Sequence, residues 1–153
     1  MNQKFIVAQK MESNERENSI VGTASTQKMD RDKEIILSSA WKLDNYRKNP
    51  VICLAHDYSS LPIGKCLWIK TVEGSGLRFK AKFANTERGK EVYQLYSEGI
   101  LNSFSVGFAP NSGGVIDNPT QREYKGAKRL FTDVELLEIS CVTIPANSDA
   151  IVD

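Results

Sequence analysis

Short apolar runs of strand length are the feature that most constrains how this chain folds. Residues 77–83 alternate strictly, with apolar side chains on one face and basic side chains on the other, which is the period of a half-buried strand. Residues 51–55 are apolar throughout, which indicates a strand covered on both faces. The purely apolar runs are only a few residues long, whereas a membrane-spanning helix needs about 20 such residues.

The same patterns recur along the chain and predict a mostly β fold with flanking helices, of the α+β class. Many strands with few helices favour an antiparallel, barrel-like core over a parallel α/β sheet. Six to eight strands are expected, with strand character at residues 4–8, 19–24, 34–37, 51–55, 65–71, 77–83, 102–109 and 130–144, the last being one bent strand or two. A single domain over residues 1–153 is expected.

Two helices and one long loop complete the prediction. Residues 85–98 carry an apolar stripe at helical spacing, with Asn85 or Thr86 as the cap. A weaker helix is expected over residues 40–46, capped by the preceding serines. Residues 110–128 are rich in Gly, Asn, Pro and charge, which predicts a long flexible loop.

The composition narrows the functional classes. A hydrophobic content of 41% argues against a disordered chain, and a net charge of +1 gives no basic face for nucleic acid. Three cysteines without close pairs argue against a disulfide framework and favour a reducing compartment. The first ten residues lack the apolar core of a secretion signal, so a cytoplasmic location is expected.

The first candidate for chemistry is His56, the one histidine of the chain. It follows the apolar run at 51–55 and precedes Asp57. A general base near neutral pH is most simply a histidine, so a serine nucleophile here would depend on His56. The alternative is a structural or exposed histidine at a strand end.

The second candidate is Ser105, which lies in the middle of a predicted strand. Alternation places Ser103, Ser105 and Gly107 on one face and the large apolar residues on the other. A face of small residues leaves room for another chain to approach. The alternative is a packing surface beneath a helix, with the hydroxyl hydrogen-bonded locally.

The third candidate is Glu138, an acid inside an otherwise apolar run. A carboxylate on a central strand costs several kcal/mol unless it is paired or hydrogen-bonded. Alternation puts Glu138 and Ser140 on one face, and an acid there could orient His56 as the third member of a triad does. The alternative is an edge strand with Glu138 in water. Glu135 and Asp133 are weaker candidates because they lie nearer the loop.

Two hypotheses based on cysteine, a zinc site and a cysteine nucleophile, are alternatives to these candidates. Cys53, His56, Cys66 and Cys141 make a nominal Cys3His zinc set. The paired-cysteine motif is absent, however, and positions 53 and 56 fall on opposite faces of a strand. Cys141 as a nucleophile is the other hypothesis, but it lies in a buried-looking run and is better explained as a small hydrophobe. We therefore expect neither a metal nor a cofactor.

Several segments together resemble the prohead serine proteases of tailed phages, a capsid-maturation family considered related to the herpesvirus assembly protease, or assemblin. The likeness spans about residues 20 to 150. The segments that carry it are residues 22–25 (Gly-Thr-Ala-Ser) with 30–31 (Asp-Arg), 49–51 (Asn-Pro-Val) leading to 56–57 (His-Asp), 63–65 (Ile-Gly-Lys), 76–79 (Gly-Leu-Arg-Phe), 98–99 (Glu-Gly) and 101–102 (Leu-Asn) before 104–108 (Phe-Ser-Val-Gly-Phe), and 137–147 (Leu-Glu-Ile-Ser-Cys-Val-Thr-Ile-Pro-Ala-Asn).

The resemblance implies a barrel-like β core with Ser105 as nucleophile and His56 as general base. Assemblins use a second histidine, which this chain lacks, so Glu138 is the third member by its place in the block and Ser140 is the fallback. Backbone N–H groups are the expected oxyanion donors.

The resemblance also implies a biological setting. The substrates would be the scaffold or capsid precursor and the protease itself, cut inside the procapsid in the cytoplasm of an infected or lysogenic bacterium. A homodimer is a further expected partnership, and neither nucleic acid nor a membrane is expected as a partner. The alternative is an inactive prophage relic, or a capsid-assembly binding module of the same fold.

Overall fold

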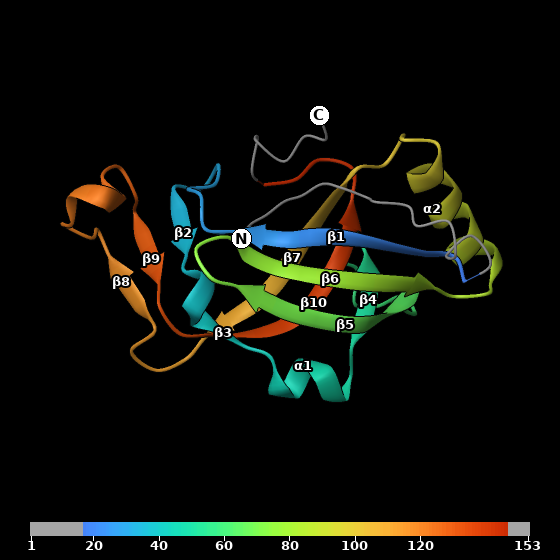
Figure 1. Cartoon of the computed structure of the whole chain (residues 1–153), viewed down its shortest axis with the longest axis horizontal. Coiled ribbons are helices and arrows are strands. Elements are labelled where there is room, and N and C mark those ends of the chain that lie inside the picture. Colours follow the sequence, from blue (N-terminus) through green and yellow to red (C-terminus); the bar gives the residue numbers. More distant parts are fainter. Residues whose placement is uncertain (1–16, 147–153) are drawn as a thin grey trace.

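The computed structural model describes residues 17–146, and Figure 1 shows their arrangement. The strand predicted at residues 4–8 lies outside the described residues. Within them the chain is mostly β with two α-helices, as the sequence predicts. None of the helices in this range is both long and apolar enough to cross a membrane.

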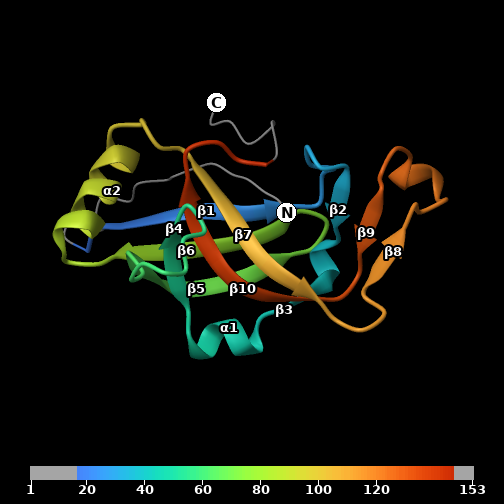
Figure 2. The same cartoon turned by 180° about the vertical axis from the view of Figure 1, so that it is seen from behind.

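The larger sheet has seven strands. Its order is β1 (Ser19–Thr26), β6 (Gly76–Phe83), β5 (Gly64–Val72), β4 (Val51–Leu54), β10 (Val134–Val142) and β3 (Trp41–Lys42), and β7 (Ser103–Pro110) also pairs with β10. The sheet curls, so that β7 and β10 cross one side of β1, β6 and β5 (Figures 1 and 2). The predicted strands at 19–24, 51–55, 65–71, 77–83 and 102–109 all lie in this sheet.

Most strand pairs of this sheet are antiparallel, and parallel pairing enters only at β10. β10 runs parallel to β3 and β4 and antiparallel to β7. In this register Ser140 lies beside Cys53, and Cys141 lies beside Leu54. The chain that leaves β4 therefore emerges next to Cys141.

A second sheet has three strands, in the order β2 (Glu34–Ile36), β9 (Arg129–Phe131) and β8 (Val115–Asp117). β8 and the short 3-10 helix η3 (Arg122–Tyr124) lie inside residues 110–128, for which a long loop was predicted. The segment acquires regular structure because β8 pairs with β9 across residues 115–117. Local composition gives no sign of a partner strand that comes later in the chain.

One of the two predicted helices lies where the sequence placed it. α2 (Glu87–Ser97) begins after Thr86, whose side chain accepts the Gly89 N–H, as predicted. The weaker helix was misplaced. Residues 38–42 instead form the 3-10 helix η2 (Ser38–Ala40) and β3, and α1 (Asp44–Lys48) begins only afterwards. Ser38 is not a helix cap here, because its hydroxyl accepts the Gly74 N–H and its own N–H is bound by Gln27.

The core lies between the two halves of the curled sheet. The apolar face of β6, predicted from its alternation, is buried. Phe104 of β7 packs edge-on against Phe79 of β6, with ring centroids 4.8 Å apart, and stacks on Tyr96 of α2 at 4.9 Å. The Tyr96 hydroxyl donates to the Ser103 carbonyl at 2.6 Å. These contacts hold β7 at the residues that flank Ser105.

Replacing Phe104 by Ala should lower the free energy of unfolding by about 3–5 kcal/mol, since the ring is fully buried between β6 and α2. Urea denaturation followed by tryptophan fluorescence measures this change. The control is Leu61→Ala. Leu61 is 87% exposed, so its replacement should change stability by less than about 0.5 kcal/mol. Equal midpoints for the two variants would contradict the packing described here.

Candidate active site

His56 is placed by an unusual backbone turn at the end of β4. Ala55 and His56 both adopt left-handed conformations, with φ of 53° and 55°, which non-glycine residues rarely do. Hydrogen bonds to β10 hold the turn, because the Ala55 N–H donates to the Cys141 carbonyl at 2.9 Å and the His56 N–H to Ser140 Oγ at 3.0 Å. The imidazole is thereby directed toward β7.

Ser105 meets the imidazole from β7. It lies opposite Ser140 in the antiparallel pairing of β7 with β10, and its Oγ is 2.9 Å from His56 Nε2. The residue is only 4% exposed. The hydroxyl is bonded to the ring across the strands, which disagrees with the alternative of a locally bonded packing residue.

Glu138 completes a line of three groups. Its Oε2 lies 2.6 Å from His56 Nδ1. An ionised carboxylate only accepts hydrogen bonds, so beside one Nδ1 would carry the proton and Nε2 would be left to accept the Ser105 hydroxyl. Glu138 is 3% exposed on the strand that pairs with β4 and β7, which disagrees with the alternative of an edge strand with Glu138 in water.

A β-bulge directs Glu138 out of the apolar core. Leu136 pairs with Phe108 and Glu138 pairs with Gly107, so Leu137 is an extra residue on β10. Leu136 and Ile139 both lie in the core although they are three positions apart, and Leu137 is 47% exposed. Bulges re-aim side chains in this way. If residues 136–138 ran as a regular strand with no bulge, alternation would place Glu138 on the face of Leu136, inside the core.

Ser140 supports the acid rather than replacing it. Its Oγ donates to Glu138 Oε1 at 2.7 Å and accepts the His56 backbone N–H, so Ser140 contacts His56 through the main chain. Glu135 and Asp133, the weaker candidates, bond elsewhere. Glu135 accepts from Asn45, and Asp133 accepts from Asn111 and lies 3.6 Å from Lys42.

One residue of this network was missed at the sequence level. The Tyr58 hydroxyl donates to Glu138 Oε2 at 2.9 Å. Tyr58 lies in a polar turn after His56, where neither periodicity nor a motif distinguishes it. The sequence identified Gly107 only as one of the small residues on one face of β7. A Cβ atom at position 107 would overlap Glu138 Oε2.

An open hollow of about 310 Å³ gives access to the serine and the histidine. The imidazole side is not sealed, since the His56 side chain is 33% exposed. The remaining lining comes from the loop after β1, from the last residue of β10 and from the chain after it, as Arg31, Asp32, Val142, Ile144, Pro145 and Ala146. A polypeptide reaching Ser105 would lie against these two segments.

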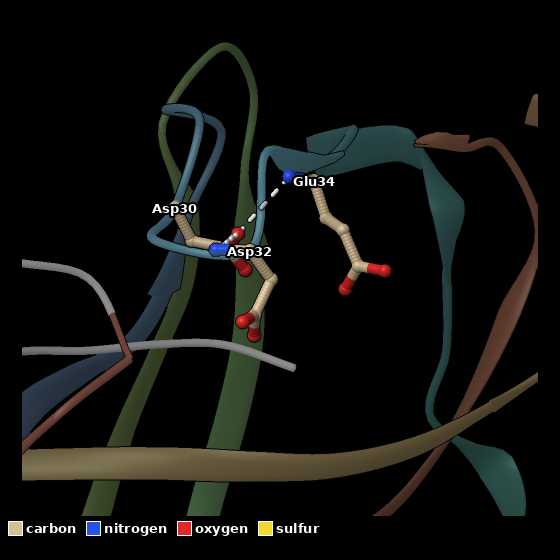
Figure 3. A group of neighbouring side chains, drawn as sticks. All are labelled: Asp30, Asp32 and Glu34. Carbon is tan, nitrogen blue, oxygen red and sulfur yellow. Dashed lines mark hydrogen bonds between the residues drawn. The ribbon is translucent and has the colours of Figure 1, made fainter. Parts of the chain in front are cut away.

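The loop on one side of the hollow is shaped by an aspartate. Asp30 Oδ1 accepts the backbone N–H groups of Asp32 and Glu34, at 2.9 and 3.0 Å (Figure 3). Burial raises the pKa of Asp30 above its usual value. The Glu34 carboxylate pairs with Arg129 of β9 at 2.6 Å. These acids close a turn and attach it to the smaller sheet, and the Arg31 N–H binds the Ala146 carbonyl at 3.1 Å.

The three cysteines lie outside the network. All three are free and buried. Burial raises the pKa of Cys141 to about 12 and the pKa of Cys53 and Cys66 to about 11, so each thiol keeps its proton at neutral pH. The hypothesis of a Cys141 nucleophile disagrees with this burial. In residues 17–146 the carboxylate, thiol and imidazole groups that do gather at metal-binding distances are Asp30, Asp32 and Glu34, not the Cys3His set.

Comparison with known proteins gives two matches in sequence and none in structure. A family model described as the caudovirus prohead serine protease matches residues 7–153. A curated relative from Escherichia phage T5, named prohead protease, is 35% identical over 145 residues, which are 91% of this chain and 63% of the relative. The chain therefore spans less than two thirds of that relative's length. No solved structure matches the chain, so the likeness of its fold to the herpesvirus assembly protease stays a prediction.

The burial of the three thiols can be tested by their reactivity. At pH 8 the native protein should react with Ellman's reagent slowly, because all three thiols are buried and their pKa values lie at about 11 or 12. In guanidinium chloride all three should react at once, since unfolded thiols have a pKa near 8.5. Raising the pH should accelerate the native reaction. A fast-reacting thiol in the native protein at pH 8 would contradict the burial described here.

Proposed function

The chain belongs to the caudovirus prohead serine protease family, and on that premise we propose that it is a serine endopeptidase of capsid maturation. The observation that carries the proposal is the line from Ser105 Oγ through the His56 ring to Glu138 Oε2, with separations of 2.9 and 2.6 Å. Both distances lie within hydrogen-bond reach, which the hydrolytic mechanism requires.

The reaction begins at the serine. His56 Nε2 takes the hydroxyl proton as Ser105 Oγ attacks the carbonyl carbon of the peptide bond. Glu138 holds the ring in the required tautomer and stabilises the imidazolium that forms. Backbone N–H groups are the proposed donors to the oxyanion. His56 then gives its proton to the leaving amine, and water repeats the sequence on the acyl-enzyme.

The substrates that we propose are the scaffold or capsid precursor, and the protease itself. The family name and the name of the phage T5 relative both refer to the prohead, where such precursors are found. The work would take place inside the procapsid, in the cytoplasm of the bacterial host. The open hollow beside Ser105 leaves room for a polypeptide. The homodimer stays a prediction.

Labelling with a fluorophosphonate tests the nucleophile. We expect one adduct on the wild type by intact mass and none on Ser105→Ala, because only Ser105 has an imidazole to take its proton. Ser103→Ala is the matched control, since Ser103 lies on the same face of β7 two residues away. An adduct on Ser105→Ala, or a modified peptide that excludes residue 105, would overturn the assignment. An inactive relic of the same fold would give no adduct on any of the three proteins.

Replacing Glu138 by Gln tests the acid. The amide keeps the shape of the side chain but loses the charge that orients the imidazole, so the labelling rate should fall by about 10⁴-fold, as in other triads. Glu135→Gln is the control, because Glu135 lies on the same strand but bonds to Asn45. The second-order rate constant of labelling measures both variants. A Glu138→Gln rate within threefold of the wild type would exclude Glu138 from the triad.

A further inference from the structure

We infer that Tyr58 is a positioning residue of this site, which holds the Glu138 carboxylate against His56. The inference rests on the proposed triad and adds a fourth side chain to it. It is based on one hydrogen bond. The Tyr58 hydroxyl donates to Glu138 Oε2, the same oxygen that is hydrogen-bonded to His56 Nδ1.

The carboxylate is held from three directions. His56 lies 2.6 Å and Tyr58 2.9 Å from Oε2, and Ser140 lies 2.7 Å from Oε1. These donors come from the turn after β4 and from β10 itself. A carboxyl group that is 3% exposed needs such hydrogen-bond partners to offset the cost of its burial. Together they leave its oxygens little freedom to turn away from the imidazole.

Tyr58 is suited to donate under all working conditions. Partial burial and the hydrogen bond to Glu138 raise the pKa of its phenol well above the usual value. The hydroxyl therefore keeps its proton at any pH at which the histidine can act as a base. As the imidazolium forms during the reaction, Tyr58 and Ser140 stabilise the negative charge on Glu138, which disfavours transfer of the Nδ1 proton to the acid.

The position of Tyr58 is not explained by core packing. The residue is 64% exposed, so its ring gains little from burial, yet its hydroxyl reaches the least accessible carboxylate of the site. The turn that carries it is closed by Asp57, which accepts from the Ser59 N–H and from the hydroxyls of Ser59 and Ser60. These hydrogen bonds lower the pKa of Asp57 to about 2, so they persist over the working range of pH.

Gly107 of β7 gives independent evidence for the contact between Tyr58 and Glu138. It faces Glu138 at the bulge. A Cβ atom there would overlap Glu138 Oε2 and lie 2.7 Å from the Tyr58 hydroxyl oxygen. Its φ is not in the left-handed region, so the backbone conformation does not require glycine. The absent side chain makes space for the carboxylate and the phenol together.

Tyr58→Phe tests the inference, because it removes only the hydroxyl and leaves the exposed ring in place. We expect the fluorophosphonate labelling rate at pH 7.5 to fall by about tenfold to a hundredfold, the effect of losing a hydrogen bond to a charged group. Tyr124→Phe, which alters a half-buried tyrosine beside the smaller sheet, should leave the labelling rate unchanged.

A second measurement separates positioning from a structural role. His56 is the one histidine of the chain, so the NMR signals of ¹⁵N-labelled histidine need no assignment. The Nδ1 proton bonded to Glu138 should shift in Tyr58→Phe and stay in place in Tyr124→Phe. Gly107→Ala should shift it as well, because the added methyl group displaces the acid.

The outcomes distinguish this inference from the proposed function. Unchanged labelling and an unchanged Nδ1 signal in Tyr58→Phe would overturn the role of Tyr58 while leaving the protease proposal intact. Slower labelling without a shift of the signal would also overturn it, since Tyr58 would then act on the reagent and not through Glu138. If the wild type is not labelled at all, the proposed function fails. The Nδ1 signal then decides alone whether Tyr58 holds Glu138 against His56.

Discussion

A carboxyl group buried inside a β-sheet is the constraint on which the rest of this structure depends. Glu138 is almost completely buried, and a buried carboxyl group is tolerated only where hydrogen-bond partners surround it. Each nearby irregularity supplies a donor or makes space. The left-handed turn at residues 55–56 brings the imidazole, the polar turn after it brings the Tyr58 hydroxyl, and Gly107 leaves the volume that the acid occupies.

Strand β10 is the element that joins these features. Its parallel pairing with β4 brings His56 beside Ser140, and its antiparallel pairing with β7 brings Ser105 to the same place. The bulge at Leu137 shifts the alternation, so Leu136 and Ile139 remain in the core while Glu138 turns to the opposite face. Two segments far apart in the sequence, β4 with the turn after it and β7, therefore meet at β10. The register of β10 with each of them sets the distances among the side chains.

Sequence reasoning recovered what depends on local periodicity. The alternation in β6, the capped helix α2 and the shared face of Glu138 and Ser140 are properties of neighbouring residues. What it missed depends on partners distant in the chain. The pairing of β8 with β9 and the parallel register of β4 with β10 are decided by tertiary packing. Tyr58 was missed for the same reason, because its only distinguishing feature is a contact with an acid 80 positions later.

The alternation of β10 also explains why serine, and not cysteine, is available for chemistry at this site. Ser140 lies on the face of Glu138, and the adjacent Cys141 lies on the opposite face, fully buried in the core. On β7 the same division separates Ser105 from Phe104 and Val106. A slip of one residue in the register of either strand would exchange these faces. It would place a thiol or an aromatic ring at the imidazole and a carboxylate or a hydroxyl in the core. The packing that stabilises the core is thus the same packing that selects which groups reach the hollow.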